Sequence, residues 1–252
     1  MMHPFHPSGA TIDRAIVHAR SVASSTAASQ PSAVPYTEPM GRRIFILSPA
    51  RCDGERAQMV LSPHATFALA RRMREGTGAP LGDVMTFLSG LYFRGKLTYA
   101  EAFARPPAGG DGVLVITSDS GLKTPGTPVT AEALRRAARV DIDAKNRRYR
   151  RPLETSAAAL AARLARGDDV VLLGSIASPK YVDVLTDVFG DRLLFPLEFV
   201  GRGDMSRGGL LLRCVRAGEE LTYVPVRGTV RSGQRPPKLE PLRRAAQPAE
   251  DH

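Results

Sequence analysis

The sequence contains no tryptophan, only two cysteines and no long run of apolar residues. Cys52 and Cys214 are too few for a disulfide framework, and neither has a second cysteine at metal-ligand spacing. No stretch approaches the roughly 18 apolar residues of a membrane span. The first residues also lack the basic start and apolar run of a secretory signal. We therefore expect a cytoplasmic protein without a membrane segment, a metal site or a cofactor.

The 252 residues are 43% hydrophobic but only 6% aromatic, so the core must consist mainly of Leu, Val, Ile and Ala. Such a core suits helices packed on a sheet. Residues 1–41 are rich in Ser, Ala and Pro and are expected to be flexible. Residues 233–252 read as a flexible, basic, Pro-rich tail. Residues 42–232 are left as a single α/β domain.

Strand and helix patterns alternate through this domain. Apolar runs predict strands over residues 43–48, 112–117, 169–174, 193–195, 210–215 and 221–226, with a short edge strand at 140–143. Helical spacing predicts helices over residues 66–74, 81–91, 98–104, 130–139, 155–166 and 179–189. Because helices separate the first three strands, these strands are expected to be parallel. The predicted fold is a mostly parallel central sheet flanked by helices, with a C-terminal antiparallel hairpin formed by the last two strands.

The loops that leave parallel strands at their carboxyl ends gather at one edge and form a ligand crevice. Here those loops begin at Ser48, Ser118 and Gly174. Gly174 and Ser175 lead into a helix whose second residue is Lys180, an arrangement that suits an anion at a helix N-terminus. The segment matches neither the dinucleotide fingerprint nor the P-loop pattern. The alternative is that these small polar residues only serve the turns.

Residues 201–209 are the most glycine-rich segment of the chain and are expected to form a basic loop. Five of them are candidate ligand contacts: Arg202, Gly203, Asp204, Ser206 and Arg207. Arginine offers forked donors for phosphate or carboxylate, and glycine allows the backbone to approach a ligand closely. Asp204 is a candidate general base, a partner that orients an arginine, or a contact for a ligand hydroxyl. The alternative is a plain loop in which Asp204 pairs with one of its own arginines.

The net charge is +10, and its distribution is uneven. Residues 202–244 contain ten Lys and Arg against four Asp and Glu, and a second cluster lies in the linker-like segment 145–151. A basic surface attracts phosphate-bearing partners, so we expect nucleic acid or a phosphorylated small molecule. The alternative is arginine that merely serves as a solvated surface residue in a sequence rich in Ala and Arg.

Three further candidates come from single positions. Asp53 and Asp119 both follow strands and offer carboxylates for acid/base work. Cys52 beside Arg51 is either an activated thiol or a small buried hydrophobe, and the second role is more common. Residues 91–100 interleave aromatic and cationic side chains. They suit nucleic-acid stacking, or a helix junction whose lysine and arginine, Lys96 and Arg94, stay in water.

Three segments also resemble a known family: residues 46–51 (ILSPAR), 91–95 (LYFRG) and 115–122 (VITSDSGL). Together they are similar to the YaaA-type peroxide-stress proteins and related bacterial α/β domains. Members open with a strand ending in S-P-A-K or S-C-x-x-K, followed by L-Y-x-G and S-x-x-Y-G-L-L. Here an arginine, Arg51, replaces the lysine, and residues 119–120 replace the aromatic position. The resemblance covers about residues 44–125 and implies a basic cleft that binds nucleic acid, with Ser48, Arg51, Ser118 and Gly121 at the cleft. It implies no activity.

Three functions follow as hypotheses. The first is a nucleic-acid- or nucleotide-binding protein whose basic loop holds phosphate. The second is an enzyme acting on a nucleotide or nucleobase, for example at the N-glycosidic bond, with Asp204, Asp119 or Asp53 as acid/base. The third is a non-catalytic partner-binding module whose charge is incidental.

Overall fold

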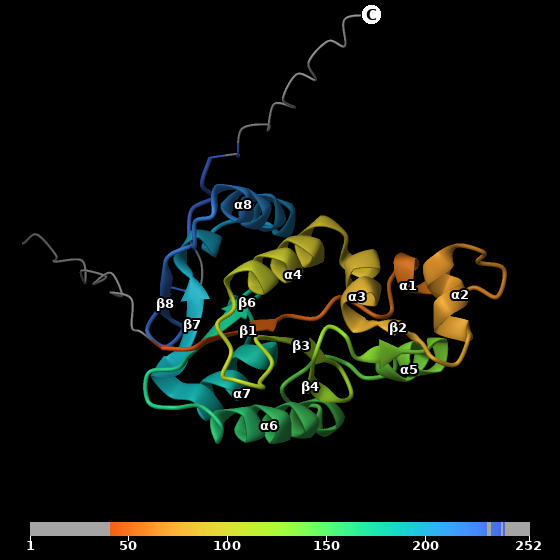
Figure 1. Ribbon diagram of the computed structural model, residues 1–252, viewed down its shortest axis with the longest axis horizontal. Coiled ribbons are helices and arrows are strands. Elements are labelled where there is room, and N and C mark those ends of the chain that lie inside the picture. Colours follow the sequence, from red (N-terminus) through yellow and green to blue (C-terminus); the bar gives the residue numbers. More distant parts are fainter. Residues whose placement is uncertain (1–40, 231–232, 238, 240–252) are drawn as a thin grey trace, which may run out of the picture. The chain divides into compact units, whose positions relative to one another are not determined.

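A six-stranded sheet forms the centre of the computed structural model, which describes residues 41–230, 233–237 and 239 (Figure 1). In spatial order its strands are β4 (Gly121–Lys123), β3 (Val113–Thr117), β1 (Arg43–Leu47), β6 (Asp169–Leu173), β7 (Leu193–Pro196) and β8 (Tyr223–Pro225). The four inner strands are parallel, and the edge strands β4 and β8 are antiparallel to their neighbours. The predicted α/β class with a mostly parallel sheet is confirmed.

Three of the four inner strands, β1, β3 and β6, have five residues each and are buried along their whole length. Phe45 of β1 pairs with Val113 of β3 on one side and with Val171 of β6 on the other. Strands covered by helices on both faces need continuous apolar runs, and this is why the sequence pattern located these three strands correctly. The core of the protein lies on both sides of β1.

Helices cover both faces of the sheet (Figure 1). One face carries α4 (Leu91–Phe103) and α8 (Asp204–Ala217), which pack closely on each other. The opposite face carries α6 (Arg147–Ala161) and α7 (Pro179–Phe189), which also pack on each other. The result is a three-layer α/β/α arrangement.

The remaining elements lie beyond the β3 and β4 side of the sheet or join the strands. They are α1 (Glu55–Leu61), α2 (Ala68–Arg74), β2 (Ala79–Pro80), α3 (Leu81–Ser89), β5 (Pro128–Val129), α5 (Ala131–Ala137), η1 (Gly190–Arg192) and η2 (Leu197–Phe199). β2 and β5 form a separate antiparallel pair. The predicted cap of α5 is present, since the Thr130 hydroxyl accepts a hydrogen bond from the Ala133 amide.

The antiparallel pair near the C-terminus is present, but its strands differ from those predicted. Residues 210–215 were expected to form a strand and instead lie inside α8. β8 therefore pairs with β7, with Phe195 opposite Val224. The apolar run 210–215 is too short for its period to separate strand from helix, and the glycines before it suggested a loop.

Four local predictions were also wrong. The expected edge strand at 140–143 has no regular structure, and the expected turn at 92–96 is a continuous part of α4. The linker-like basic segment 145–151 includes the first turns of α6, which the Asn146 side chain caps at the Arg148 amide. The helix expected from residue 66 begins at Ala68, and α1 was not predicted.

The predicted flexible segment 1–41 and most of the predicted tail 233–252 lie outside the described residues. In the part of the chain that is described, no helix is long and apolar enough to cross a membrane.

Candidate functional site

The site lies where the carboxyl ends of β1 and β6 meet. The chain leaves β1 toward the face covered by α4, whereas it leaves β6 toward the opposite face, through α7 (Figure 1). Neighbouring parallel strands whose connections part in this way open a crevice between their ends. Ser48 follows β1 directly and Gly174 follows β6, so the two predicted turns stand side by side.

Two adjoining cavities, of about 430 Å³ and 450 Å³, open at this edge. They share Arg51, Ile142 and Lys180, so they adjoin, and we call the two together the crevice. The first cavity is lined by residues 48–51, 88, 89, 92, 142, 175, 178, 180, 181 and 204, and the second by residues 51–53, 118, 137, 138, 140–143 and 180. Each volume lies in the range of small-molecule sites.

Behind the first cavity, Lys96 of α4 is buried, with 1% of its surface exposed. Its Nζ donates hydrogen bonds to the Ser48 carbonyl oxygen at 2.6 Å and to Ser48 Oγ at 2.8 Å. The ring centroids of Tyr92 and Phe93 lie 4.5 and 4.9 Å from the same nitrogen. Burial lowers the pKa of Lys96 to about 7, while the Asp204 carboxylate opposes that fall. Lys96 is thus poised between its charged and neutral forms near neutral pH.

A close helix crossing keeps water away from Lys96. α4 and α8 meet at Gly95 and Gly208, and a Cβ on Gly95 would stand 2.7 Å from the Gly208 carbonyl oxygen. A Cβ on Gly208 would stand 2.8 Å from the Leu91 carbonyl oxygen. Only glycine fits at both positions. Their close approach places α8 beside the α4 turn that carries Lys96.

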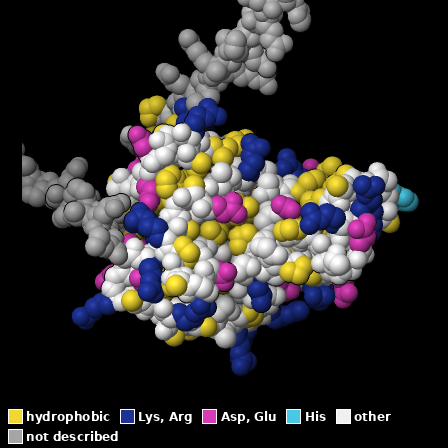
Figure 2. Space-filling view, viewed as in Figure 1, with side chains coloured by type: hydrophobic (Ala, Val, Ile, Leu, Met, Phe, Trp, Pro, Cys, Tyr) yellow, Lys and Arg dark blue, Asp and Glu magenta, His cyan; other side chains and the backbone are white. Residues whose placement is uncertain are grey.

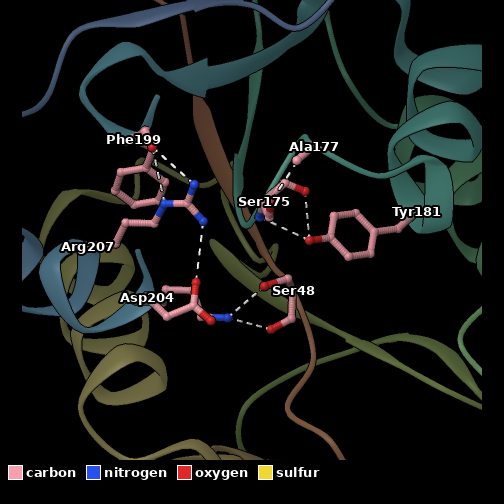
Figure 3. Close-up of polar contacts among 8 residues, drawn as sticks. Ser48, Ser175, Ala177, Tyr181, Phe199, Asp204 and Arg207 are labelled. Carbon is pink, nitrogen blue, oxygen red and sulfur yellow. Dashed lines mark hydrogen bonds and ion pairs between the residues drawn. The ribbon is translucent and has the colours of Figure 1, made fainter. Parts of the chain in front are cut away.

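The start of α8 forms one side of the site. Asp204 is its first residue, lines the first cavity and exposes 66% of its side chain. Arg207 is buried and donates two hydrogen bonds to the Phe199 carbonyl oxygen, at 3.2 and 3.0 Å. It also donates to Asp204 Oδ1 at 3.4 Å. Arg207 therefore ties α8 to η2 and orients Asp204 (Figure 3).

The opposite side is built on Tyr181 of α7. Its hydroxyl accepts a hydrogen bond from the Ser175 amide at 3.0 Å and donates to the Ser175 carbonyl oxygen at 2.9 Å. Burial raises the pKa of Tyr181, so the hydroxyl stays protonated. Gly174 leaves the space this requires, because a Cβ there would lie 2.8 Å from Ser48 Cβ. Figure 3 shows Ser48 between the Tyr181 side and the Asp204 side.

Most of the predicted site residues reach the crevice. The first cavity includes Ser48, Arg51, Ser175, Lys180 and Asp204, and the second includes Arg51, Asp53, Ser118 and Lys180. Gly174 lies directly behind Ser48. The turns at Ser48, Ser118 and Gly174 thus lie at or next to the two cavities, and their role in binding stays a prediction.

Six predicted residues of the described chain are not among those that line the crevice: Asp119, Arg202, Gly203, Ser206, Arg207, and Gly174, which lies behind Ser48. Asp119 lines a different cavity, next to α5. Arg202 donates to the Glu198 carbonyl oxygen at 3.0 Å and to Ser206 Oγ at 3.3 Å, and Gly203 is the N-cap of α8. The predicted basic loop 201–209 is mostly the first turn of a helix, because residues 204–209 belong to α8.

The structure also bears on two single-residue candidates, the Asp53 carboxylate and the Cys52 thiol. Asp53 accepts two hydrogen bonds from Arg51, which hold its pKa below the usual range. Cys52 is buried, and burial raises its pKa to about 12, with Asp119 and Asp53 adding to the rise. A thiol so hard to ionise is not an activated nucleophile. The packing role proposed for Cys52 is the one this environment supports.

Sequence reasoning missed Lys96, Tyr92 and Tyr181. A signal for Lys96 was present, because the buried residues Tyr92, Phe93, Lys96, Tyr99 and Ala100 of α4 follow helical spacing. Treating 92–96 as a turn hid this stripe and left Lys96 in water. The Tyr92 hydroxyl is buried at the first cavity and has no hydrogen-bond partner within the described chain.

Comparison with models of protein families, with curated protein sequences and with solved structures finds no match. The resemblance to the YaaA-type proteins therefore stays a prediction. Of the residues it points to, Ser48 and Arg51 line the first cavity and Ser118 lines the second, while Gly121 opens β4 with a φ of +69°. Among the described residues, no group of three or more His, Cys, Asp or Glu is arranged to hold a metal ion.

Proposed function

We propose that the crevice binds a phosphate-bearing small molecule of nucleotide size. The observation that carries this proposal is the position of Arg51 and Lys180, which line both cavities and so stand where the two join. Lys180 is exposed and makes no ion pair within the described chain. It also belongs to the first turn of α7, whose N-terminus favours negative charge. These features support a phosphate at the junction.

The rest of the lining suits the remainder of a nucleotide. Asp204 lies in the first cavity, and Asp53, Asp141 and Asp143 lie in the second. Carboxylates repel a chain of phosphates but accept hydrogen bonds from ribose hydroxyls and base amino groups. A ligand with one phosphate group and several hydroxyls matches this lining better than a polynucleotide does.

The surface charge supports the same choice. On the face shown in Figure 2, the Lys and Arg side chains of the described residues are dispersed among Asp and Glu. A nucleic-acid interface usually gathers its cations in a patch or stripe. The charge on this face therefore favours a small ligand over a polynucleotide.

Isothermal titration calorimetry with AMP, adenosine and ribose 5-phosphate tests this proposal. AMP should bind at least tenfold more tightly than adenosine, because a charge-assisted hydrogen bond contributes about 1.5–3 kcal/mol. Lys180→Ala should weaken AMP binding by about tenfold. Arg166→Ala, which removes an exposed cation just before the amino end of β6, serves as the control. If no phosphate compound binds more tightly than about 1 mM, the proposal is wrong.

A further inference from the structure

Ser48 and Lys96 are arranged in space as a serine nucleophile and its general base are, with the serine at the cavity and the lysine behind it. Ser48 lines the first cavity and is 6% exposed. Lys96 is not among the described residues that line the cavity, and its Nζ lies 2.8 Å from Ser48 Oγ on the buried side. A base that stands behind a hydroxyl at hydrogen-bond distance is the arrangement that activates serine. In the neutral form of Lys96, the same contact lets the Ser48 hydroxyl donate to the amine.

The surroundings of Lys96 favour a base over a structural cation. No carboxylate hydrogen-bonds to its Nζ, whose acceptors are the two oxygens of Ser48. The groups that face it are the Tyr92 and Phe93 rings from α4, and Asp204 and Arg207 from α8. Burial lowers the pKa of Lys96 to about 7, far below that of a lysine in water, and so favours the free amine that a base requires.

Donors for a developing oxyanion are also at hand. The amides of Ala50 and Arg51, which line the same cavity, donate no hydrogen bond within the described part of the chain. Unsatisfied donors beside a nucleophile are the groups that stabilise a tetrahedral intermediate.

We propose that Ser48 is a nucleophile with Lys96 as its general base, and that the crevice hydrolyses a carboxylic ester of its ligand. This inference rests on the proposed function in taking the crevice as the ligand site. It adds a reaction, which ligand binding alone does not require.

The reaction balances without any further reagent. Lys96 takes the Ser48 proton as Oγ bonds to the carbonyl carbon, and the carbonyl oxygen becomes an oxyanion. The oxyanion collapses, the ester C–O bond breaks, and the departing alcohol takes the proton from Lys96. Water then attacks the acyl-serine, with Lys96 accepting its proton and returning one to Oγ. The sum is ester plus water giving acid plus alcohol.

Labelling by a fluorophosphonate, followed by intact-protein mass spectrometry and peptide mapping, tests the pair. The wild-type protein should gain one phosphonyl group on Ser48 with loss of fluoride. Ser48→Ala should abolish labelling, and Lys96→Met should slow it about 100-fold or more. The controls are Ser120→Ala and Arg166→Met, which alter exposed residues that line neither cavity of the crevice and should leave the rate unchanged.

The pH profile of wild-type labelling gives a second readout that needs no folding-sensitive variant. The rate should rise with a midpoint near pH 7, as Lys96 loses its proton. Asp204→Asn should move that midpoint lower, because the Asp204 carboxylate supports the protonated lysine. An unlabelled wild-type protein, labelling at another residue, or a flat pH profile would overturn the proposal.

The two proposals fail in different ways. Labelling of Ser48 in a protein that binds no phosphate compound would refute the proposed ligand and leave the pair in place. AMP binding in a protein that is never labelled would refute the pair and leave the binding site. If both proposals are correct, saturating AMP should protect Ser48 from the fluorophosphonate.

Discussion

Lys96 exchanges water for the two oxygens of Ser48 and the faces of two aromatic rings. A lysine in such surroundings loses part of its hydration and so releases its proton more readily than in water. This single residue links the core of the protein to the crevice. Its behaviour can be measured without knowing any ligand.

The stability of the protein should therefore depend on pH through Lys96. Its folded pKa of about 7 lies below the ordinary lysine value of 10.5. Between these values the unfolded chain holds a proton that the folded chain has released, so the free energy of unfolding rises with pH. Lys96→Met should lose this rise, which amounts to at most about 1.4 kcal/mol per pH unit. Urea unfolding between pH 7.5 and 9.5 measures it.

Subtracting the free energy of unfolding of the variant from that of the wild type at each pH cancels the contributions of all other titrating groups. Lys145→Met, which alters an exposed lysine, should keep the wild-type slope. Parallel pH profiles for wild type and Lys96→Met would show that Lys96 titrates normally. That result would also remove the physical basis for its role as a base.

At the scale of elements, the sequence predicted what depends on local pattern and missed what depends on packing. Strands β1, β3 and β6 were found because both of their faces are buried, and α5 and α7 because their caps and spacing agree. α6 begins with four arginines in five residues and contains Pro152, so its start looked like a linker. α8 was missed because its glycines serve a helix crossing, which a single sequence does not reveal.

The same contrast between local pattern and packing explains which site residues the sequence predicted. The turns after the parallel strands were located because topology alone brings them to one edge. Lys96 was missed because the charged groups that face it, Asp204 and Arg207, belong to α8, which lies more than one hundred residues further along the chain. Arg202 and Arg207 were assigned to a ligand, although both donate hydrogen bonds to carbonyl oxygens of η2. No local pattern distinguishes an arginine that binds a ligand from one that ties two elements together.

The α4–α8 crossing gives a prediction at this scale. Gly208→Ala should destabilise the protein by about 1–3 kcal/mol, because the new Cβ would meet the Leu91 backbone at 2.8 Å. Intrinsic helix propensity alone predicts the opposite, a gain of about 1 kcal/mol for alanine in a helix. The sign of the change in urea unfolding therefore decides between close packing and a loose contact.

The control for this experiment is Gly126→Ala. Gly126 has open space around the position of a Cβ and a φ outside the left-handed region. Its replacement should change stability by less than about 0.5 kcal/mol. A stabilised Gly208→Ala protein would contradict the close crossing.

At the scale of the whole molecule, two basic features are separate. The cations of the crevice, Arg51 and Lys180, lie among carboxylates, whereas Arg147, Arg148 and Arg151 are exposed at the start of α6. These three arginines form no ion pair within the described residues and line an open hollow. Nucleic acid attracted by net charge is expected on α6 and not in the crevice.

Replacement of all three α6 arginines by alanine tests this separation. Fluorescence anisotropy should show weaker binding of mixed-sequence single-stranded DNA at low salt. The slope of log affinity against log salt should fall by about 2, because three phosphate contacts are lost. AMP binding should be unchanged. Three results would contradict binding of DNA on α6. They are an unchanged slope, no DNA binding by the wild type, and competition between AMP and DNA.

The crossing of α4 and α8 also sets the moment at which the site comes into existence. During synthesis β1 and α4 leave the ribosome well before α8, so Ser48 and Lys96 are made before Asp204 and Arg207, the charged groups that face Lys96. A nascent chain, or one cut before Asp204, therefore lacks both of these groups, and we expect its Ser48 to react more slowly until α8 has packed.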